Sequence, residues 1–319
     1  MVGRKGAVLV IGIGGAIGGA AARAMLARGW TIRALVRDPA KFAHWPDEIQ
    51  WVCGDALDTE TVVAAAEGAD IVFHGANPPM YRHWRKWGLP MLANSIAAAE
   101  QARARLVFPG NVYNFGPDAG AVIDEDSPQH PLTRKGAIRV EMEAMLRDAS
   151  QRGRMRALVV RAGDFFGGGA RGSWFAEVIA PAKPDGPIRY PGRFDVGHAW
   201  AYLPDLAEAM TRLIEIEASL PAWEAVHFGG HWVEPGVEMA EAVRRALGGR
   251  GAVRPLPWLP FRLLSPLSPF LRELLEMRYL WLEPLRLNNG KLVGLIGDEP
   301  HTPLDQAVEA AVAALGREL

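Results

Sequence analysis

The stretch "AVLVIGIGGAIGGAAARAMLARG", residues 7–29, joins an apolar run to an alanine-rich run through a turn full of glycines. The five residues of "AVLVI" carry no polar side chain, as is typical of a strand that is buried on both faces of a sheet. The alanine-rich run ends at Gly29, a residue type that commonly follows the last turn of a helix. The stretch therefore predicts a strand, a tight turn and a helix in that order.

The same alternation continues downstream. Further strands are expected at residues 31–37, 49–55, 69–76, 105–110 and 155–163, and further helices at residues 61–68, 89–103 and 134–151. Strands that alternate with helices predict a doubly wound parallel sheet of the α/β class. After residue 165 the spacing becomes irregular and rich in glycine and proline. We predict one domain over residues 1–165, which strands near 198–204 and 225–229 also join, and a smaller substrate-binding region over residues 166–319.

Bulk composition describes an ordinary globular chain. Its 319 residues are 49% hydrophobic, and its 35 basic and 36 acidic residues leave a net charge of -1. No global field recruits nucleic acid or an anionic membrane, so only local patches of charge remain open. The single cysteine, Cys53, indicates a reducing, cytoplasmic compartment and is expected to be small, apolar and buried. No apolar run reaches the roughly 18 to 20 residues of a transmembrane helix.

Three glycines of the first turn, Gly12, Gly15 and Gly18, have the spacing G-x-x-G-x-x-G. In such a turn the first glycine permits the bend, the second lets the backbone approach a pyrophosphate, and the third lets the helix pack closely on the sheet. The helix N-terminus then points unsatisfied N–H groups at the phosphates. A purely structural turn has the same spacing, but the flanking strand and helix favour a dinucleotide site that includes Ala16 and Ile17.

The second expected strand ends in "ALVRDPAK", at the edge where dinucleotide-binding proteins distinguish their cofactors. A carboxylate there bonds a ribose 2′-hydroxyl, whereas a cation pairs with a 2′-phosphate. Arg37 stands at this edge with Lys41 nearby, and a guanidinium can hold a phosphate through two hydrogen bonds. We therefore expect NADP(H) to be preferred, with NAD(H) as the alternative if Arg37 only forms a solvated pair with Asp38.

With these features the chain resembles the short-chain dehydrogenase/reductase superfamily, in the extended or atypical branch that includes epimerase/dehydratase-like, NmrA-like and isoflavone-reductase-like proteins. The resemblance implies a Rossmann domain that binds NAD(P). In that family an Asp after the third strand contacts the adenine, and "CGDALD" matches it with Asp55, followed by Ala56. The loop after the fourth strand lies along the cofactor, and "HGANPP" matches it with Gly75, Ala76 and Asn77.

The catalytic positions of that family are occupied by other residues here. The family holds its substrate with a Ser or Thr after the fifth strand and moves protons with a Tyr-x-x-x-Lys pair. In this chain "GNVYNFG" puts Asn111 at the serine position, and "KGAIR" puts Lys135 and Arg139 at the positions of the tyrosine and the lysine. Isoflavone-reductase-like relatives use a lysine on this helix with NADPH. The resemblance thus implies Lys135 as proton donor or base, with Tyr113 as a second candidate.

Lysine chemistry at this position depends on its surroundings. A lysine transfers protons near neutral pH if burial or a neighbouring positive charge lowers its pKa, and Arg139 is such a neighbour. The alternative is a solvated basic helix face on which Arg139 pairs with Glu143. An amide such as that of Asn111 can still hydrogen-bond a substrate carbonyl.

Three further segments are expected on the substrate side. Residues 77–90 follow the fourth strand, and loops at the carboxyl ends of parallel strands line ligand crevices, so Tyr81 and Trp84 are expected pocket residues. A surface loop and a nucleic-acid patch are the alternatives. The segment "RAGDFFGGG" adds Asp164 and Phe165, and an Asp where nucleotide-sugar enzymes of the family usually carry Asn argues against such a substrate. The apolar residues 257–284 are expected to pack in the C-terminal region or to form a lid.

Taken together, these features favour an NADP(H)-dependent oxidoreductase that acts on a carbonyl or hydroxyl of a small, apolar or aromatic molecule. The first alternative is a non-catalytic NADP-sensing protein of the NmrA-like kind, and the second is a sugar epimerase or dehydratase. We expect neither a nucleic-acid nor a membrane partner and no metal. A homodimer through the helices near 89–103 and 135–151 is expected from the resemblance.

Overall fold

The computed structural model describes residues 5–78, 83–170, 172–183 and 185–316. Its strands are β1 (Ala7–Ile11), β2 (Thr31–Val36), β3 (Gln50–Cys53), β4 (Ile71–His74), β5 (Arg105–Asn111), β6 (Val122–Ile123), β7 (Arg156–Ala162), β8 (Asp164–Phe166), β9 (Ile188–Tyr190), β10 (His198–Tyr202), β11 (Trp223–His227), β12 (His231–Val233), β13 (Val253–Pro255) and β14 (Arg286–Leu287). Its α-helices are α1 (Ala16–Ala27), α2 (Thr59–Ala65), α3 (Leu89–Ala102), α4 (Arg134–Gln151), α5 (Leu203–Glu215), α6 (Glu238–Ala246), α7 (Trp258–Leu264), α8 (Pro269–Glu276), α9 (Gly290–Ile296) and α10 (Leu304–Ala314).

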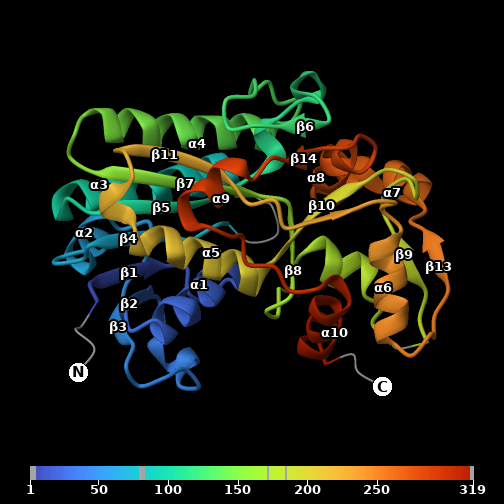
Figure 1. Ribbon diagram of the computed structural model, residues 1–319, viewed down its shortest axis with the longest axis horizontal. Helices are drawn as coiled ribbons and strands as arrows, with labels where there is room; N and C mark the ends of the chain where they lie inside the picture. Colours follow the sequence, from blue (N-terminus) through green and yellow to red (C-terminus); the bar gives the residue numbers. More distant parts are fainter. Residues whose placement is uncertain (1–4, 79–82, 171, 184, 317–319) are drawn as a thin grey trace.

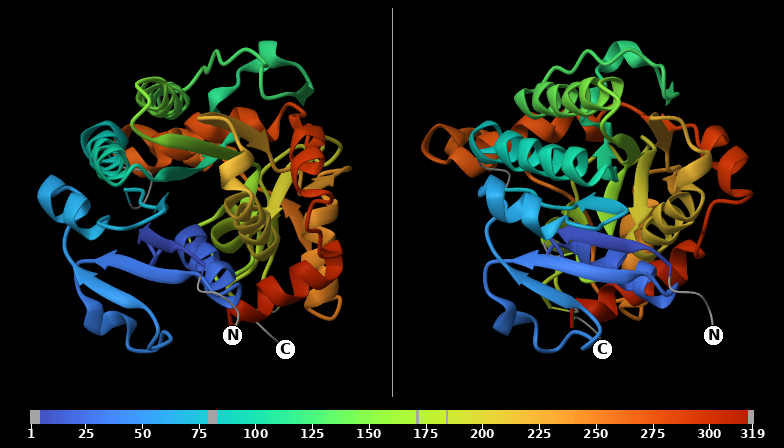
Figure 2. Two further views of the ribbon diagram at one scale, coloured as in Figure 1. Left: turned by 60° about the vertical axis from the view of Figure 1, so that its left-hand side comes forward. Right: turned by 90° about the vertical axis from the view of Figure 1, so that its left-hand side faces the viewer.

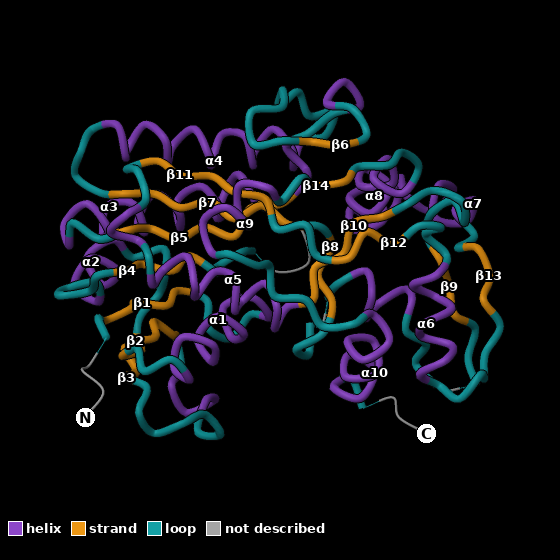
Figure 3. The backbone as a smooth tube through the Cα atoms, in the orientation of Figure 1, coloured by secondary structure: helices purple, strands orange, loops and turns teal. Residues whose placement is uncertain are grey.

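A seven-stranded parallel sheet forms the centre of the molecule, in the order β11-β7-β5-β4-β1-β2-β3. Figure 3 shows these strands side by side, with β8, β10 and β12, which form a second sheet, set apart from them. The order reverses between β1 and β4, so the chain leaves these two neighbouring strands toward opposite faces. Such a reversal opens a crevice at the carboxyl ends of the strands, which is where ligands bind in open α/β sheets.

Helices cover both faces of this sheet, as the strand pattern predicts (Figures 1 and 2). Side chains alternate along β1, so Val8 and Val10 pack in one apolar cluster while Leu9 and Ile11 pack in the other. The first cluster lies under α1 and α5, and the second lies under α2, α3 and α4. The fold is therefore a doubly wound, Rossmann-like α/β sheet.

The strand near residues 198–204 was expected in the central sheet, and this prediction is wrong. Instead β10 lies between β8 and β12 in a separate three-stranded sheet. Gly163 separates β7 from β8, and a Cβ there would lie 2.2 Å from the carbonyl oxygen of Ala199. The chain thus passes close to β10 as it leaves the central sheet, and β8 then pairs with β10. The strand expected near 225–229 does join the central sheet, as β11 beside β7.

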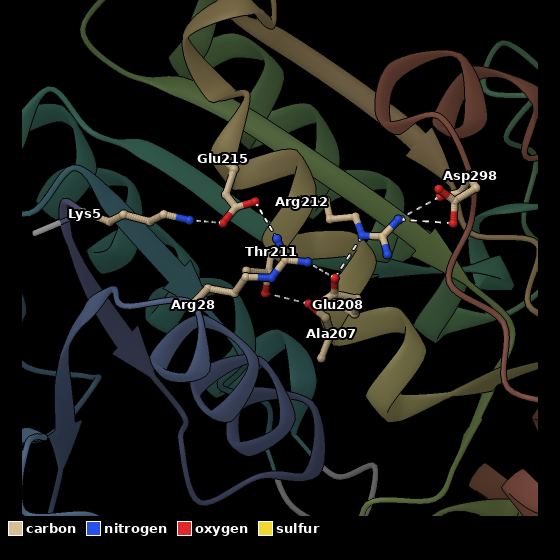
Figure 4. Close-up of polar contacts among 8 residues, drawn as sticks. All are labelled: Lys5, Arg28, Ala207, Glu208, Thr211, Arg212, Glu215 and Asp298. Carbon is tan, nitrogen blue, oxygen red and sulfur yellow. Dashed lines mark hydrogen bonds and ion pairs between the residues drawn. The ribbon is translucent and has the colours of Figure 1, made fainter. Parts of the chain in front are cut away.

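Polar contacts fasten α5 to the N-terminal part of the chain (Figure 4). Glu215 accepts hydrogen bonds from Lys5 and Arg28, and Glu208 accepts one from Arg28. Arg212 of the same helix reaches Asp298 at 3.3 Å. Residues from beyond position 200 thus complete the N-terminal sandwich. None of the helices in the described part of the chain is long and apolar enough to cross a membrane.

Cys53 differs from expectation, because its side chain is exposed. It ends β3, the outermost strand of the central sheet, where no further strand covers it. Its thiol donates to the carbonyl oxygen of Arg37 at 3.5 Å.

Candidate active site

Two glycines of the first turn are required by the backbone itself. Gly12 has a φ of +93°, and a Cβ there would lie 2.6 Å from the backbone nitrogen of Ala76. A Cβ on Gly18 would lie 2.2 Å from the carbonyl oxygen of Gly12. The loops after β1 and β4 therefore touch at the point where the strand order reverses, and Gly18 brings α1 up against them.

Gly15 is not explained by internal packing in this way. A Cβ there would meet no atom closer than the Gly12 carbonyl oxygen at 3.3 Å. Gly15 is also the N-cap of α1, where it makes no side-chain cap, and the first turn of the helix contains no acidic residue. A helix N-terminus without a side-chain cap fits the pyrophosphate of a dinucleotide, with the first turn of Ala16, Ile17 and Gly18 facing it.

The charged residues after β2 do not form the Arg37–Asp38 pair that the sequence left open as an alternative. Asp38 does not pair with Arg37; its carboxylate caps the next turn through the Ala40 N–H at 3.2 Å and lies 3.7 Å from Lys41 Nζ. Arg37 is exposed, and its guanidinium has no ion pair among the described residues. A cation is thus left free at the edge of the sheet that distinguishes the two cofactors.

The other expected cofactor residues stand at the carboxyl ends of β3 and β4. The exposed Asp55 carboxylate accepts a hydrogen bond from the Leu57 N–H at 3.0 Å. The carbonyl oxygen of Ala56 accepts from the Asn94 side chain at 2.9 Å. Gly75 extends β4 through a 2.8 Å bond from its N–H to the Ile11 carbonyl, and Ala76 and the exposed Asn77 follow. All of these residues therefore lie along one edge of the sheet.

Lys135 is buried at the start of α4. Thr133 caps this helix by accepting from the Gly136 N–H at 2.9 Å, which places Lys135 in the first turn. Only 2% of the Lys135 surface is exposed. Its Nζ lies 3.5 Å from the Glu276 carboxylate, which also accepts hydrogen bonds from the N–H groups of Arg134 and Lys135. One carboxylate from α8 thus meets both the ammonium and the N-terminus of α4.

The alternative of a solvated basic helix face is wrong. Arg139 is half-buried, and its guanidinium donates to the Pro109 carbonyl at 3.3 Å. It also lies 4.9 Å from the centre of the Trp84 ring and 5.2 Å from that of Phe108. Glu143 has another partner, because its carboxylate accepts three hydrogen bonds from the fully buried Arg161.

Asn111 and Tyr113 stand where the sequence puts them, just after the buried part of β5. The Asn111 side chain accepts from the Tyr113 N–H at 3.0 Å and so caps a short 3-10 turn, Val112–Asn114. Tyr113 is 6% exposed. A second aromatic side chain comes from the C-terminal region, where the Tyr279 hydroxyl donates to the Phe115 carbonyl at 3.4 Å.

Burial governs the titration of this corner of the molecule. It lowers the pKa of Lys135 below its ordinary range, while the Glu276 carboxylate opposes that shift. Burial, with help from the Arg139 charge, lowers the pKa of His74 to about 3. Burial raises the pKa of the Tyr279 phenol, and Asp164 and Glu276 raise it further. At neutral pH the imidazole of His74 is therefore neutral and the phenol keeps its proton.

The expected substrate-side residues divide between the site and the core. Asp164 begins β8 and lies 2.8 Å from His198 Nε2, and the His198 ring stacks on Trp281 with 3.8 Å between ring centres. Phe165 follows Asp164 and is partly buried. Trp84 is 3% exposed and belongs to the core, so it contributes through Arg139. Tyr81 lies outside the described residues.

Sequence reasoning missed Glu276, Tyr279 and His198. Glu276 is 141 residues from Lys135, and nothing in its local pattern announces the contact. One buried ion pair could have been predicted. Arg161 lies inside the apolar run "RALVVRA", where a charge needs a buried partner, and that partner is Glu143. Among the described residues, no three His, Cys, Asp or Glu side chains come together as a metal site would require.

Comparison with known proteins places this arrangement in a family. The model of the "NAD dependent epimerase/dehydratase family" matches residues 8–226. A "3-diazoavenalumate denitrifying reductase" from a Streptomyces species is 32% identical over 133 residues, which cover 38% of this chain and 43% of that protein. The match therefore spans less than half of that relative's length.

Solved structures resemble the chain over almost its whole length. A UDP-glucuronic acid 4-epimerase from Bacillus cereus, in complex with UDP-glucuronic acid and NAD, has a TM-score of 0.76 at 16% identity, over 97% of this chain and 99% of that one. A putative epimerase from Burkholderia cenocepacia J2315 has a TM-score of 0.73 at 20% identity, over 98% and 99% of the two chains. At this level of identity the likeness concerns the fold.

Proposed function

Because this chain belongs to the NAD dependent epimerase/dehydratase family, we propose that it is an NADP(H)-dependent oxidoreductase whose Lys135 takes the place of the usual catalytic tyrosine. Its substrate is a small apolar or aromatic molecule with a carbonyl or hydroxyl group. A nicotinamide cofactor supplies or accepts the hydride in such chemistry. The turn of Gly12, Gly15 and Gly18 with α1 holds the pyrophosphate, and Asp55 and the loop from Gly75 to Asn77 line the rest of the cofactor.

The burial of Lys135 is the observation that carries this proposal. A lysine on the solvent face of a helix keeps its ammonium in water, whereas Lys135 is 2% exposed and its ammonium faces the Glu276 carboxylate. Moving a charge from water into the protein interior costs free energy. A buried ammonium is therefore retained where it has a function or a partner. The lowered pKa brings its proton closer to the range in which an amine exchanges protons with an alkoxide.

The surrounding groups support a division of labour. Asn111 orients the substrate oxygen, and Tyr113 stands two residues further on as a second polar group. Arg139 holds the helix to the end of β5 through the Pro109 carbonyl and adds positive charge beside the site. On the substrate side, Asp164 and Phe165 lead into the aromatic cluster around His198 and Trp281, which favours an apolar or aromatic substrate over a sugar.

The test is the exchange Lys135→Met, which keeps the length of the side chain and removes the amine. We expect turnover of carbonyl substrates to fall about 10²- to 10⁴-fold, the usual contribution of a positioned acid or base, while NADPH affinity stays the same. Steady-state NADPH oxidation over a panel of apolar aldehydes and ketones measures the first, and fluorescence titration measures the second. The exposed neighbour Arg134→Met is the matched control. Full activity of Lys135→Met would exclude the assignment.

The cofactor preference rests on Arg37. The exchange Arg37→Ala removes the free cation at the end of β2, so we expect NADPH to bind about tenfold more weakly and NADH to bind unchanged. Arg154→Ala serves as the control, because this exposed arginine precedes β7 at the amino-terminal edge of the sheet. Equal affinity of the natural chain for both cofactors would contradict the preference.

The similarity to a denitrifying reductase supports a second candidate, the reductive removal of nitrogen from a diazo compound. A diazonium carbon that accepts a hydride loses its C–N bond, and the electron pair of that bond leaves with N₂. The product needs no proton, so such an enzyme has no use for a tyrosine acid. This reading accounts for the exchanged Tyr-x-x-x-Lys positions without lysine chemistry.

Lys135→Met separates the two candidates. NADPH oxidation with an aryl diazonium salt survives this exchange if no proton is transferred, whereas carbonyl reduction does not. Tight NADPH binding without turnover of either substrate class favours a non-catalytic sensor. Retention of oxidised cofactor through purification favours a sugar epimerase or dehydratase, because such enzymes return the hydride to their own substrate.

A further inference from the structure

A group of exposed leucines lies on α7 and on the short turn that follows it, η8 (Ser265–Leu267). Of the eight large apolar side chains that are exposed in the described part of the chain, four lie in these ten residues. They are Leu259, Leu263, Leu264 and Leu267, with 65%, 70%, 53% and 85% of their surface exposed. We call them the leucine face. Contiguous apolar surface of this kind on a folded protein marks an interaction site.

The opposite side of α7 is already used for packing. Trp258 donates its indole N–H to the Pro191 carbonyl at 2.9 Å, and its ring lies 6.2 Å from that of Trp174. Phe261 packs beside Trp258 at 5.9 Å. At 100° per residue Leu259, Leu263 and Leu264 fall within an arc of about 140°, on the side away from these rings. Leu267 follows on η8.

The segment that carries the leucine face is basic, between Glu241 and Glu273. Residues 242–272 contain six arginines and no aspartate or glutamate. Arg244, Arg245 and Arg250 are paired with carboxylates outside this run. Arg254, Arg262 and Arg272 are exposed and have no ion pair among the described side chains. The near-neutral charge of the whole chain hides this local excess of positive charge.

We propose that the leucine face docks on the surface of an anionic lipid bilayer, with α7 lying in the plane of the interface and with Arg262 of α7 and Arg272 of α8 at the phosphate level. A bilayer offers hydrocarbon to the leucines and negative charge to the arginines along the same plane. A second copy of the chain satisfies only the first need, because it brings Arg262 and Arg272 against their own equivalents. The charge pattern thus selects the bilayer.

The place of the leucine face gives such docking a consequence. In Figure 1, α7 and α8 lie at the end of the molecule opposite α2 and α3. α7 packs against α8, and the last residue of α8 is Glu276, which contacts Lys135. Docking would hold the substrate-side region next to the bilayer, where apolar small molecules collect. The proposal itself rests on the leucines and arginines and does not depend on the proposed enzymatic function.

Vesicle flotation with the full chain tests this proposal. We expect the protein to float with vesicles of phosphatidylcholine containing about 30% phosphatidylglycerol, and to float much less with phosphatidylcholine alone or in high salt. The double exchange Leu263→Glu, Leu267→Glu should lower the bound fraction, with an apparent affinity at least about tenfold weaker. The pair Arg262→Gln, Arg272→Gln should remove most of the preference for anionic lipid.

Leu132→Glu is the matched control, because Leu132 is also 70% exposed but lies at the start of α4. It should float like the unchanged chain. The proposal is overturned if the unchanged chain stays with the soluble fraction, or if Leu263→Glu, Leu267→Glu floats as well as it does. It is also overturned if light scattering finds a dimer that the double exchange dissolves while no form of the chain binds vesicles.

Discussion

The proposed cofactor edge and the corner around Lys135 are built in different ways. The cofactor edge is formed by backbone atoms of residues at the ends of adjacent strands, where Gly12 lies against Gly75 and Ala76. The Lys135 corner is formed by side chains, and the carboxylate beside the ammonium belongs to Glu276, 141 residues away in the chain. A site made of backbone depends on the absence of side chains, whereas a site made of side chains depends on partners that can be exchanged.

The largest expected effect separates two glycines of the same turn. Gly12→Ala puts a Cβ at a positive φ and 2.6 Å from the backbone of Ala76, so we expect a loss of about 2 to 4 kcal/mol of folding free energy. Gly15 has a negative φ, and Gly15→Ala brings a Cβ to 3.3 Å from the Gly12 carbonyl oxygen, a tight contact that a small shift can relieve. We therefore expect a smaller loss of stability together with weakened NADPH binding. Urea unfolding and cofactor titration of both variants measure this. Equal destabilisation by the two exchanges would show that Gly15 also serves packing.

A smaller effect is expected from breaking the pair at the other corner. Glu276→Gln removes the carboxylate that lies 3.5 Å from the buried Lys135 ammonium, so we expect a loss of about 1 to 3 kcal/mol of folding free energy. Adding Lys135→Met to that variant should restore part of the loss, because the buried ammonium is then gone. The exposed Glu283→Gln is the control. Additive effects of the two exchanges in a double-mutant cycle would mean that the residues are not coupled.

The same variant sharpens the chemical side of the contrast. The carboxylate of Glu276 favours the ammonium form of Lys135, against the effect of burial. If this ammonium donates the proton, reduction falls as pH rises through the pKa of Lys135. Glu276→Gln should therefore move that fall to lower pH. An unchanged pH profile of NADPH oxidation would show that Lys135 does not donate the proton.

The smallest effect concerns His74, which ends β4 between the two regions. Its pKa is lowered to about 3 in the folded protein, so the unfolded chain takes up the proton first as pH falls. The stability that the neutral imidazole provides is present above about pH 6.5 and is lost below it, by at most about 1.4 kcal/mol per pH unit. Urea unfolding between pH 7 and 5 should show a shallower decline for His74→Asn.

Local pattern was enough for most of the sandwich. The helix expected at residues 134–151 is α4 with the same bounds, and the first strand is β1 as expected. Both follow from hydrophobic periodicity and end signals that act over a few residues. The expected cofactor residues fall on one edge because the carboxyl ends of parallel strands always share an edge.

The misjudged residues share a different cause. The apolar run of β10 would suit a strand in either sheet. Its place beside β8 and β12 depends on tertiary contacts such as that between Gly163 and Ala199. Cys53 is exposed because β3 is the last strand of its sheet, which depends on the order of all seven strands. Likewise, nothing in "WLPFRLL" tells which of its apolar residues face water.

By itself the sequence determined the doubly wound sheet, the glycine turn and the positions at which Lys135 and Arg139 stand in α4. Those properties rest on steric limits and periodicity, which act between neighbours in the chain. Only the tertiary structure decided that Lys135 is buried against Glu276, that Glu143 belongs to Arg161 and that the leucine face remains uncovered. Burial and charge pairing depend on which distant segments meet, and no local pattern encodes that meeting.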